Sequence, residues 1–263
     1  MNKIKKLIAF TLAETLIVMG IIGIVAALTI PNVNKNTGEA EKVAKVKKIY
    51  AELSEAHDRA TAVYGPIEKW FVNDNCSTDG TDCENARKRY FDRITEFMKV
   101  QKSCRDNNDD ICIQSDKKLL HGGNVTNDNY RDYPSVILSS NTSFSIGVIP
   151  KPKCNSASSG YQNYCGFLFT DIDGPNKGKN SLGTDLFVFS ITKNGIRPSG
   201  GGTNWTNNNI KSCAYSGSYC AEWVIRNGNM DYLDTDHIQG MADADKGICK
   251  NGKQLSTTVS SCK

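Results

Sequence analysis

The sequence has few of the residue patterns that mark catalytic centres. It contains only three histidines, His57, His121 and His237, scattered along 263 residues. It has no HExxH, no GxSxG and no Walker-type phosphate loop, so no residue set nominates a metalloprotease, a serine hydrolase or a nucleotidase. We therefore do not expect an enzyme. A catalytic site without a familiar motif remains the least favoured alternative.

Strong charge of one sign is also missing. The formal net charge is +4, from 32 basic and 28 acidic residues. Three of the basic residues, Lys3, Lys5 and Lys6, precede the apolar stretch described below, and without them 29 basic residues face 28 acidic ones. A nearly neutral chain has no broad basic field to attract phosphates, so there is no clear nucleic-acid signal.

The ten cysteines contain no CxxC pair, which excludes the usual zinc-ribbon and thioredoxin spacings. All of them follow the apolar N-terminal stretch, as is typical of a protein in an oxidising compartment. The sequence does not determine their pairing, and some of them could be buried free thiols. We expect five local bridges, Cys76–Cys83, Cys104–Cys112, Cys154–Cys165, Cys213–Cys220 and Cys249–Cys262.

What the sequence does contain is a long apolar run near its N-terminus. Among the 21 residues from Phe10 to Ile30, Glu14 alone is charged. About 20 apolar residues span a bilayer as a helix, and the lysines before the run orient the N-terminus to the cytoplasm. A charge inside such a span costs a few kcal/mol or more and usually has a function. The position of Glu14 therefore requires an explanation.

One explanation treats the run as an ordinary secretory signal peptide. The apolar core would be Leu16–Val25, and cleavage after Ala27 would make Leu28 the first mature residue. The protein would then be an exported, disulfide-rich binding protein. This interpretation leaves Glu14 unexplained, because a charge does not belong in the apolar region of a signal peptide.

The stretch AFTLAETLIVMGIIGIVAALTIPN, residues 9–32, resembles the N-terminus of type IV pilins and type II secretion pseudopilins. In that family a short basic leader ends at a small residue, usually Gly. The mature chain then begins with Phe and carries Glu at its fifth position. The resemblance implies cleavage between Ala9 and Phe10, with Ala9 in place of the usual Gly. Pro31 stands where family members commonly carry a helix-kinking proline.

The resemblance implies a structural subunit, a minor pilin or pseudopilin, of a type IV pilus or of a type II secretion or competence filament. Glu14 would pair with the N-terminal amine of a neighbouring subunit, because a buried carboxylate needs a cationic partner. The implied partners are other pilin subunits, a prepilin peptidase and an inner-membrane assembly platform. The implied location is the inner membrane, crossed once, and afterwards a periplasmic or cell-surface filament.

After Pro31 the pattern changes to an amphipathic helix that ends at Gly65 and Pro66. Its apolar stripe has the alternating spacing of three and four residues that one helix face requires. We interpret His57 as a packed residue of this stripe and not as a ligand. The stripe consists of Val43, Val46, Tyr50, Leu53, His57, Ala60 and Tyr64.

The segments beyond this helix predict an α+β head. We expect a helix over residues 84–102, with Arg87, Lys88 and Arg89 solvated, and a hairpin after Ser135 with its turn at Asn141. Further strands are expected at Phe167–Thr170 and Leu186–Thr192, followed by a turn at Asn194-Gly195. Gly200–Gly202 and Asn207–Asn209 are expected to be surface loop.

The predicted fold class is thus α+β. A long N-terminal α-helix, hydrophobic in its first half and amphipathic in its second, would pack on an antiparallel β-sheet head with disulfide-closed loops. Residues 10–64 as one helix would be about 80 Å long. The predicted organisation is a leader (1–9), a transmembrane or filament-core helix (10–31), an amphipathic spine (32–66) and a periplasmic or extracellular head (67–263).

One loop of the head has the residues of a possible calcium site. Asp171, Asp173, Asn176 and Asp185 offer the oxygen ligands that Ca²⁺ prefers. Major pseudopilins bind calcium in a loop to which this stretch is similar. The alternative is that Asp, Asn and Gly serve here as turn residues without a metal. A second acidic stretch, Asp234–Asp245, is expected to be a solvated loop.

Overall fold

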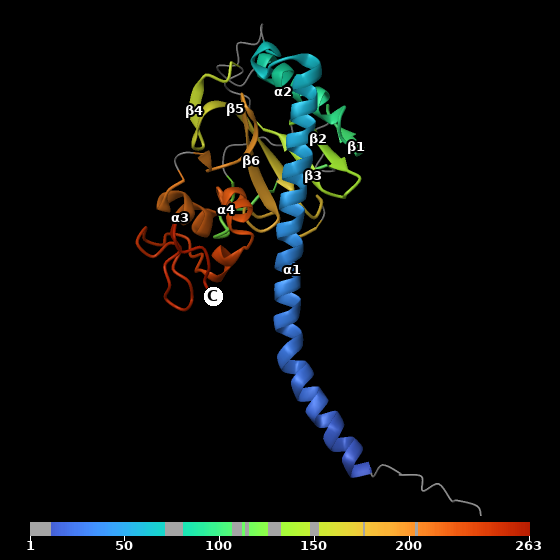
Figure 1. Cartoon of the computed structure of the whole chain (residues 1–263), viewed down its shortest axis with the longest axis vertical. Helices are drawn as coiled ribbons and strands as arrows, with labels where there is room; N and C mark the ends of the chain where they lie inside the picture. The colour runs from blue at the N-terminus through green and yellow to red at the C-terminus, as the bar shows by residue number, and fades with distance from the viewer. Residues whose placement is uncertain are drawn as a thin grey trace, which may run out of the picture. The chain divides into compact units, whose positions relative to one another are not determined.

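The computed structural model describes residues 12–71, 81–106, 112–113, 116–125, 133–147, 153–175, 177–202 and 205–263. The chain forms two compact units, Met1–Glu41 and Lys42–Lys263. Helix α1 (Leu12–Tyr64) contributes to both units (Figure 1).

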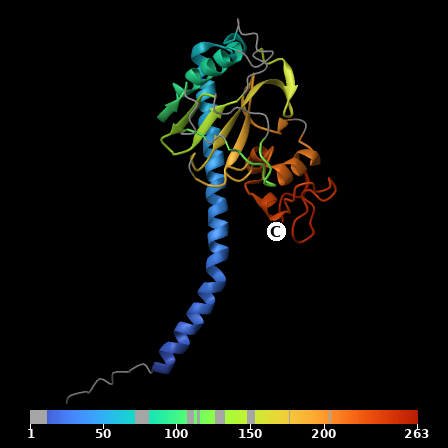
Figure 2. The ribbon, with the colours of Figure 1, turned by 180° about the vertical axis from the view of Figure 1, so that it is seen from behind.

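An antiparallel sheet is the centre of the second unit. Its strands follow the order β1-β2-β3-β5-β6-β7, with β4 paired to β5, and every pairing is antiparallel (Figures 1 and 2). The predicted turn residues connect neighbouring strands: Asn141, with a φ of 62°, lies between β2 and β3, and Gly195, with a φ of 113°, begins β7. The strands are β1 (Val100–Cys104), β2 (Ser135–Leu138), β3 (Ser143–Ile146), β4 (Ser156–Ser158), β5 (Tyr161–Asp171), β6 (Leu186–Thr192) and β7 (Gly195–Pro198).

Short helices accompany this sheet, and their ends have local causes. Thr206 and Asn209 form a capping box at the start of α3, and Gly217 ends that helix in the left-handed conformation. Gly228 ends α4 in the same way. The helices are α2 (Thr81–Thr95), α3 (Asn207–Ser216) and α4 (Cys220–Asn227), with the 3₁₀ turns η1 (Ile67–Lys69) and η4 (Asp231–Asp234).

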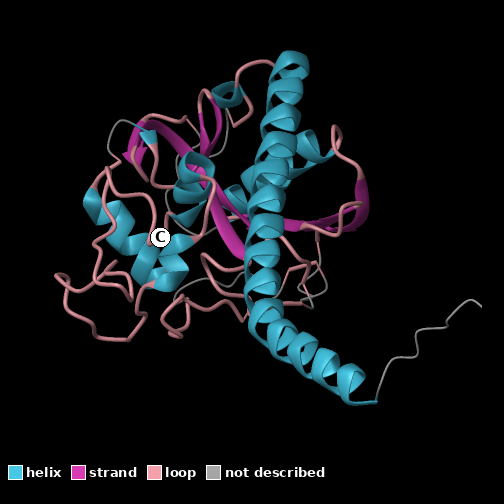
Figure 3. Cartoon of the chain, turned by 60° about the horizontal axis from the view of Figure 1, so that its bottom comes forward, coloured by secondary structure: helices cyan, strands magenta, loops and turns pink. Residues whose placement is uncertain are grey.

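The main core lies between the sheet and the helices, and the amphipathic part of α1 supplies one wall of it (Figure 3). Val46, Leu53 and Ala60 are all 0% exposed. The Tyr50 ring stacks on Phe189 of β6 with the ring centroids 5.7 Å apart. The predicted stripe therefore does face the core up to Ala60.

The fold class that we predicted is wrong. Among the residues that the structure describes, no helix has an apolar stretch long enough to span a bilayer. The large apolar side chains described between Leu12 and Ile24 are exposed and contribute nothing to the core, whose residues all follow Glu41. The second unit is instead a mostly antiparallel sheet with short helices and disulfides, and α1, with 53 residues, is much longer than those helices. The prediction took the N-terminal apolar run as a helix long enough to span a bilayer, and the described residues do not contain such a helix.

Two smaller predictions are also corrected. The helix expected over residues 84–102 ends at Thr95, because Val100–Cys104 pairs with β2 as strand β1. The segment Asn207–Asn209, expected to be a loop, is the first turn of α3. Long-range strand pairing and a side-chain cap decide these two boundaries, and neither follows from hydrophobic periodicity.

Four of the five expected cysteine pairs are disulfides in the structure. They join Cys104–Cys112, Cys154–Cys165, Cys213–Cys220 and Cys249–Cys262, across 8, 11, 7 and 13 residues of chain. Cys83 is also disulfide-bonded. Its expected partner, Cys76, lies outside the described residues. The bridges close local loops within the second unit.

Candidate functional site

The described N-terminal part of α1 carries exposed apolar side chains. Eight large apolar side chains between Leu12 and Ile24 are 51–81% exposed. A Cβ added at Gly20 or Gly23 would meet no atom within 4 Å. A continuous apolar surface of this kind usually marks an interaction site. The eight residues are Leu12, Leu16, Ile17, Val18, Met19, Ile21, Ile22 and Ile24, and we call them the apolar segment.

The residues predicted to act in processing and assembly belong to the same stretch of sequence. Ala9 and Phe10 lie outside the described residues. Glu14 and Pro31 lie on the helical backbone of α1, which continues without interruption to Tyr64, but their side chains are outside the description. The structure therefore places Glu14 among the residues of the apolar segment along the helix.

The predicted calcium loop connects β5 to β6 and begins at a buried carboxyl group. Asp171 is 0% exposed and ends β5. Its Oδ1 accepts the backbone N–H groups of Asp173, at 3.1 Å, and of Gly174, at 2.9 Å. This is an Asx-type turn, in which an aspartate side chain replaces a backbone acceptor.

Asp185 organises the other end of this loop. It is 1% exposed, and its carboxylate accepts backbone N–H groups from Lys179, Asn180 and Ser181, the last at 2.7 Å. A Cβ added at Gly178 would lie 2.2 Å from Oδ2 of Asp185 and 2.6 Å from Oδ2 of Asp173. Only glycine lets the chain pass so close to both carboxyl groups, so they lie near one another around Gly178.

Burial changes the acidity of this loop. It raises the pKa of Asp171 to about 8, and a hydrogen bond between the Asp171 and Asp173 carboxyl groups adds to the effect. Burial also raises the pKa of Asp185, while the N–H groups of Ser181 and Lys179 act in the opposite direction. Oδ2 of Asp171 and Oδ1 of Asp173 have no donor among the described residues. A proton held by Asp171 supplies such a donor at neutral pH.

The described residues do not assemble the predicted metal site. None of their His, Cys, Asp and Glu side chains form a group of three or more that could hold a metal ion. Asn176 lies outside the described residues. The oxygens of Asp171 and Asp185 bind backbone N–H groups, as turn residues do. Calcium binding at this loop stays an untested prediction.

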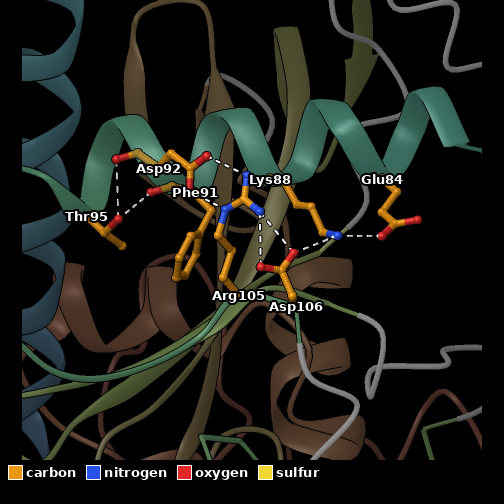
Figure 4. A network of polar contacts seen from close by, with 7 residues as sticks. All are labelled: Glu84, Lys88, Phe91, Asp92, Thr95, Arg105 and Asp106. Atoms are coloured by element: carbon orange, nitrogen blue, oxygen red, sulfur yellow. Dashed lines mark hydrogen bonds and ion pairs between the residues drawn. The ribbon is translucent and has the colours of Figure 1, made fainter.

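A network of ion pairs that sequence analysis missed connects α2 to the end of β1 (Figure 4). Arg105 binds Asp92 through Nε and Nη2, at 2.6 and 2.8 Å, and Asp106 through Nη1 at 2.9 Å. Lys88 lies 2.8 Å from Asp106 and 2.7 Å from Glu84. Exposed pairs each contribute little to stability. The network holds the start of the Cys104–Cys112 loop against α2.

Two charged or titratable residues of the second unit are buried against aromatic rings. Arg87, which we expected to be solvated, is 7% exposed and lies 4.6 Å from the ring centre of Tyr133. His57 is 1% exposed, as its place in the apolar stripe predicts, and its Nδ1 lies 3.0 Å from the hydroxyl oxygen of Tyr90. Burial lowers the pKa of His57 to about 4. Both side chains are therefore packed inside the second unit.

Comparison of the chain with family models, with curated proteins and with solved structures finds no match.

Proposed function

We propose that this chain is a structural subunit, a minor pilin or pseudopilin, of a helical filament of the type IV pilus, type II secretion or competence class. The observation that carries the proposal is the apolar segment, whose side chains are 51–81% exposed in the single chain. It directly follows the Ala9–Phe10 processing signature and surrounds Glu14 in sequence.

The physical argument is that an exposed apolar surface of this extent is stabilised when another apolar surface buries it. Helices of identical subunits can cover one another, because each brings the same apolar surface to the contact. A carboxylate at Glu14 would be costly in that contact unless a cation neutralised it. Cleavage after Ala9 creates such a cation, the new amine of Phe10, five residues from Glu14 counted inclusively. Glu14 would then set the register between neighbouring subunits.

The second unit fits a head that works outside the cytoplasm. Its four described disulfides persist in oxidising compartments and are rare in the cytosol. The proposal includes a prepilin peptidase that cuts before Phe10, an inner-membrane platform that assembles the subunit, and other pilin-like subunits as neighbours. No catalytic role is proposed for the head.

The proposal is tested by producing the full chain with a prepilin peptidase and sequencing the mature N-terminus. We expect a start at Phe10. Glu14→Ala should still be processed but should enter filaments at least tenfold less. Glu55→Ala is the matched control, since Glu55 is an exposed carboxylate of the same helix that pairs with Arg59. Normal filament entry of Glu14→Ala would contradict the assembly role.

The disulfides equally suit an exported binding protein with an ordinary signal peptide. That alternative predicts a mature chain that begins at Leu28 and lacks the whole apolar segment. The same N-terminal sequencing therefore separates the two functions.

A further inference from the structure

A small polar cavity lies within the second unit, between α3 and residues 240–246. Its volume is about 260 Å³. It is independent of the filament proposal, because none of its residues belongs to α1. Its lining includes Asn208, Lys211, Ser212 and Tyr215 of α3, with Asp243 and Lys246 of the following loop.

The cavity exists because a loop crosses the polar face of an amphipathic helix. α3 buries Ile210 and Cys213 on one face, and the cavity residues of α3 occupy the other face at helical spacing. Tyr215 holds the loop in place. Its hydroxyl oxygen accepts the N–H of Gly240 at 3.0 Å, and the Lys246 ammonium lies 4.1 Å from its ring centre.

Positive charge exceeds negative charge in this cavity. Lys246, with a side chain only 18% exposed, binds Asp243 at 2.6 Å, while the Asp243 side chain is 88% exposed. The hydrogen bond from Lys246 lowers the pKa of Asp243, and the charge of Lys211 lowers it further. Among the described residues, no hydrogen bond or ion pair engages the Lys211 ammonium. Two cations therefore share one carboxylate that solvent can reach.

We propose that this cavity binds a small oxyanion, a phosphate or carboxylate group, which replaces the Asp243 carboxylate between Lys211 and Lys246. The amide of Asn208 and the hydroxyl of Ser212 are further donors on the same face of α3. Lysine ammoniums serve as point-charge partners of such groups. The volume suits one such group and not a drug-sized ligand, for which pockets of roughly 300–1,000 Å³ are usual.

If the anion replaces the Asp243 carboxylate, substitutions of Asp243 and of the two lysines should change the affinity for phosphate in opposite directions. Asp243→Asn removes the internal competitor and should tighten binding of inorganic phosphate about tenfold. Lys211→Gln and Lys246→Gln should each weaken it about tenfold. Lys250→Gln, an exposed lysine nearby in the chain, is the control and should change nothing. Isothermal titration of the full chain in detergent, with sodium phosphate at constant ionic strength, measures all four.

A parallel titration with sodium acetate distinguishes a phosphate site from a carboxylate site. Absence of binding of either anion up to about 10 mM overturns the proposal, because even weak sites have dissociation constants near the millimolar range. Weaker phosphate binding by Asp243→Asn, or unchanged binding by Lys211→Gln, also overturns it. Lys246→Gln removes the contact with Tyr215 and can loosen the loop, whereas Lys211→Gln breaks no described contact and keeps the test decisive.

Discussion

The two stretches of α1, before and after Glu41, differ in the exposure of their large apolar side chains. Leu16 in the first stretch is 62% exposed, whereas Leu53 in the second is 0% exposed. Burial of a leucine contributes roughly 1.5–3 kcal/mol wherever it occurs. In the second stretch folding of one chain provides that burial. In the first stretch the described residues do not provide it, and under the proposed function a neighbouring subunit would.

The largest test of this difference is reduction of the disulfides. All described bridges lie after Lys42, so reduction should destabilise the folded head. A loop of about 15 residues contributes roughly 3 kcal/mol when it is closed, and the shorter loops here should each contribute somewhat less. We expect the thermal midpoint of the full chain to fall by more than 10 °C in dithiothreitol, about 4–8 °C per kcal/mol being usual for small domains. An unchanged midpoint with fully reduced thiols would contradict this.

A matched pair of leucine variants compares the two stretches directly. Leu53→Ala should lower the free energy of unfolding by about 2–5 kcal/mol, because it leaves a cavity in the core. Leu16→Ala should change it by less than about 0.5 kcal/mol, as exposed positions do. Urea unfolding followed by fluorescence of the three tryptophans, all after Glu41, measures both variants. Similar losses in the two variants would remove the distinction.

The burial of His57 should make the folded chain less stable in acid. Its pKa is about 4 in the folded chain, below the ordinary value of 6.5. Between these values the unfolded chain binds more protons, so stability falls as pH falls from 6.5 to 4, by up to about 3 kcal/mol. His57→Gln should show a smaller loss over this range. Equal pH slopes in urea unfolding of the variant and the parent chain would exclude His57 as the cause.

Asp171 should have the opposite pH dependence. Its pKa is about 8 in the folded chain, above the ordinary value of 3.8, so the folded chain binds more protons between these values. Stability should therefore fall as pH rises from 4 to 8. Asp171→Asn imitates the protonated carboxyl group and should flatten the slope. A slope that Asp171→Asn leaves unchanged would assign the proton to another group.

Calcium should have the smallest effect. Because the Asp171 and Asp185 oxygens already accept backbone N–H groups, we expect the same thermal midpoint with calcium and with chelator. A bound cation would instead raise stability by RT ln(1 + [L]/Kd). If calcium raised the thermal midpoint and Asp173→Ala abolished that rise, the result would support the predicted metal site.

The sequence predicted what local pattern controls. The stripe from Val43 to Ala60, the turn at Asn141 and the nearest-neighbour disulfides all depend on spacing within a few residues. The pairing of β1 with β2 could not be predicted in this way, because it joins segments more than 30 residues apart. For the same reason the sequence did not predict that α2 ends at Thr95.

The candidate sites show the same difference between features that the local sequence predicts and features that depend on the folded structure. The oxygens of Asp171 and Asp185 could be nominated from composition, but their preference for backbone N–H groups depends on how the loop closes around Gly178. The contact between Arg105 and Asp92 and the cavity between Lys211 and Lys246 exist only once the chain has folded. No periodic pattern marks such pairs in advance.

The four short-loop disulfides also determine how the head responds to mechanical tension. Each bridge withholds the contour length of the loop that it closes, about 3.4 Å for every residue between the paired cysteines. The bridges span 7 to 13 residues, so a pulled, oxidised head would lengthen in smaller increments than a reduced one. A chain under tension would thus keep these four loops closed even after its sheet had opened.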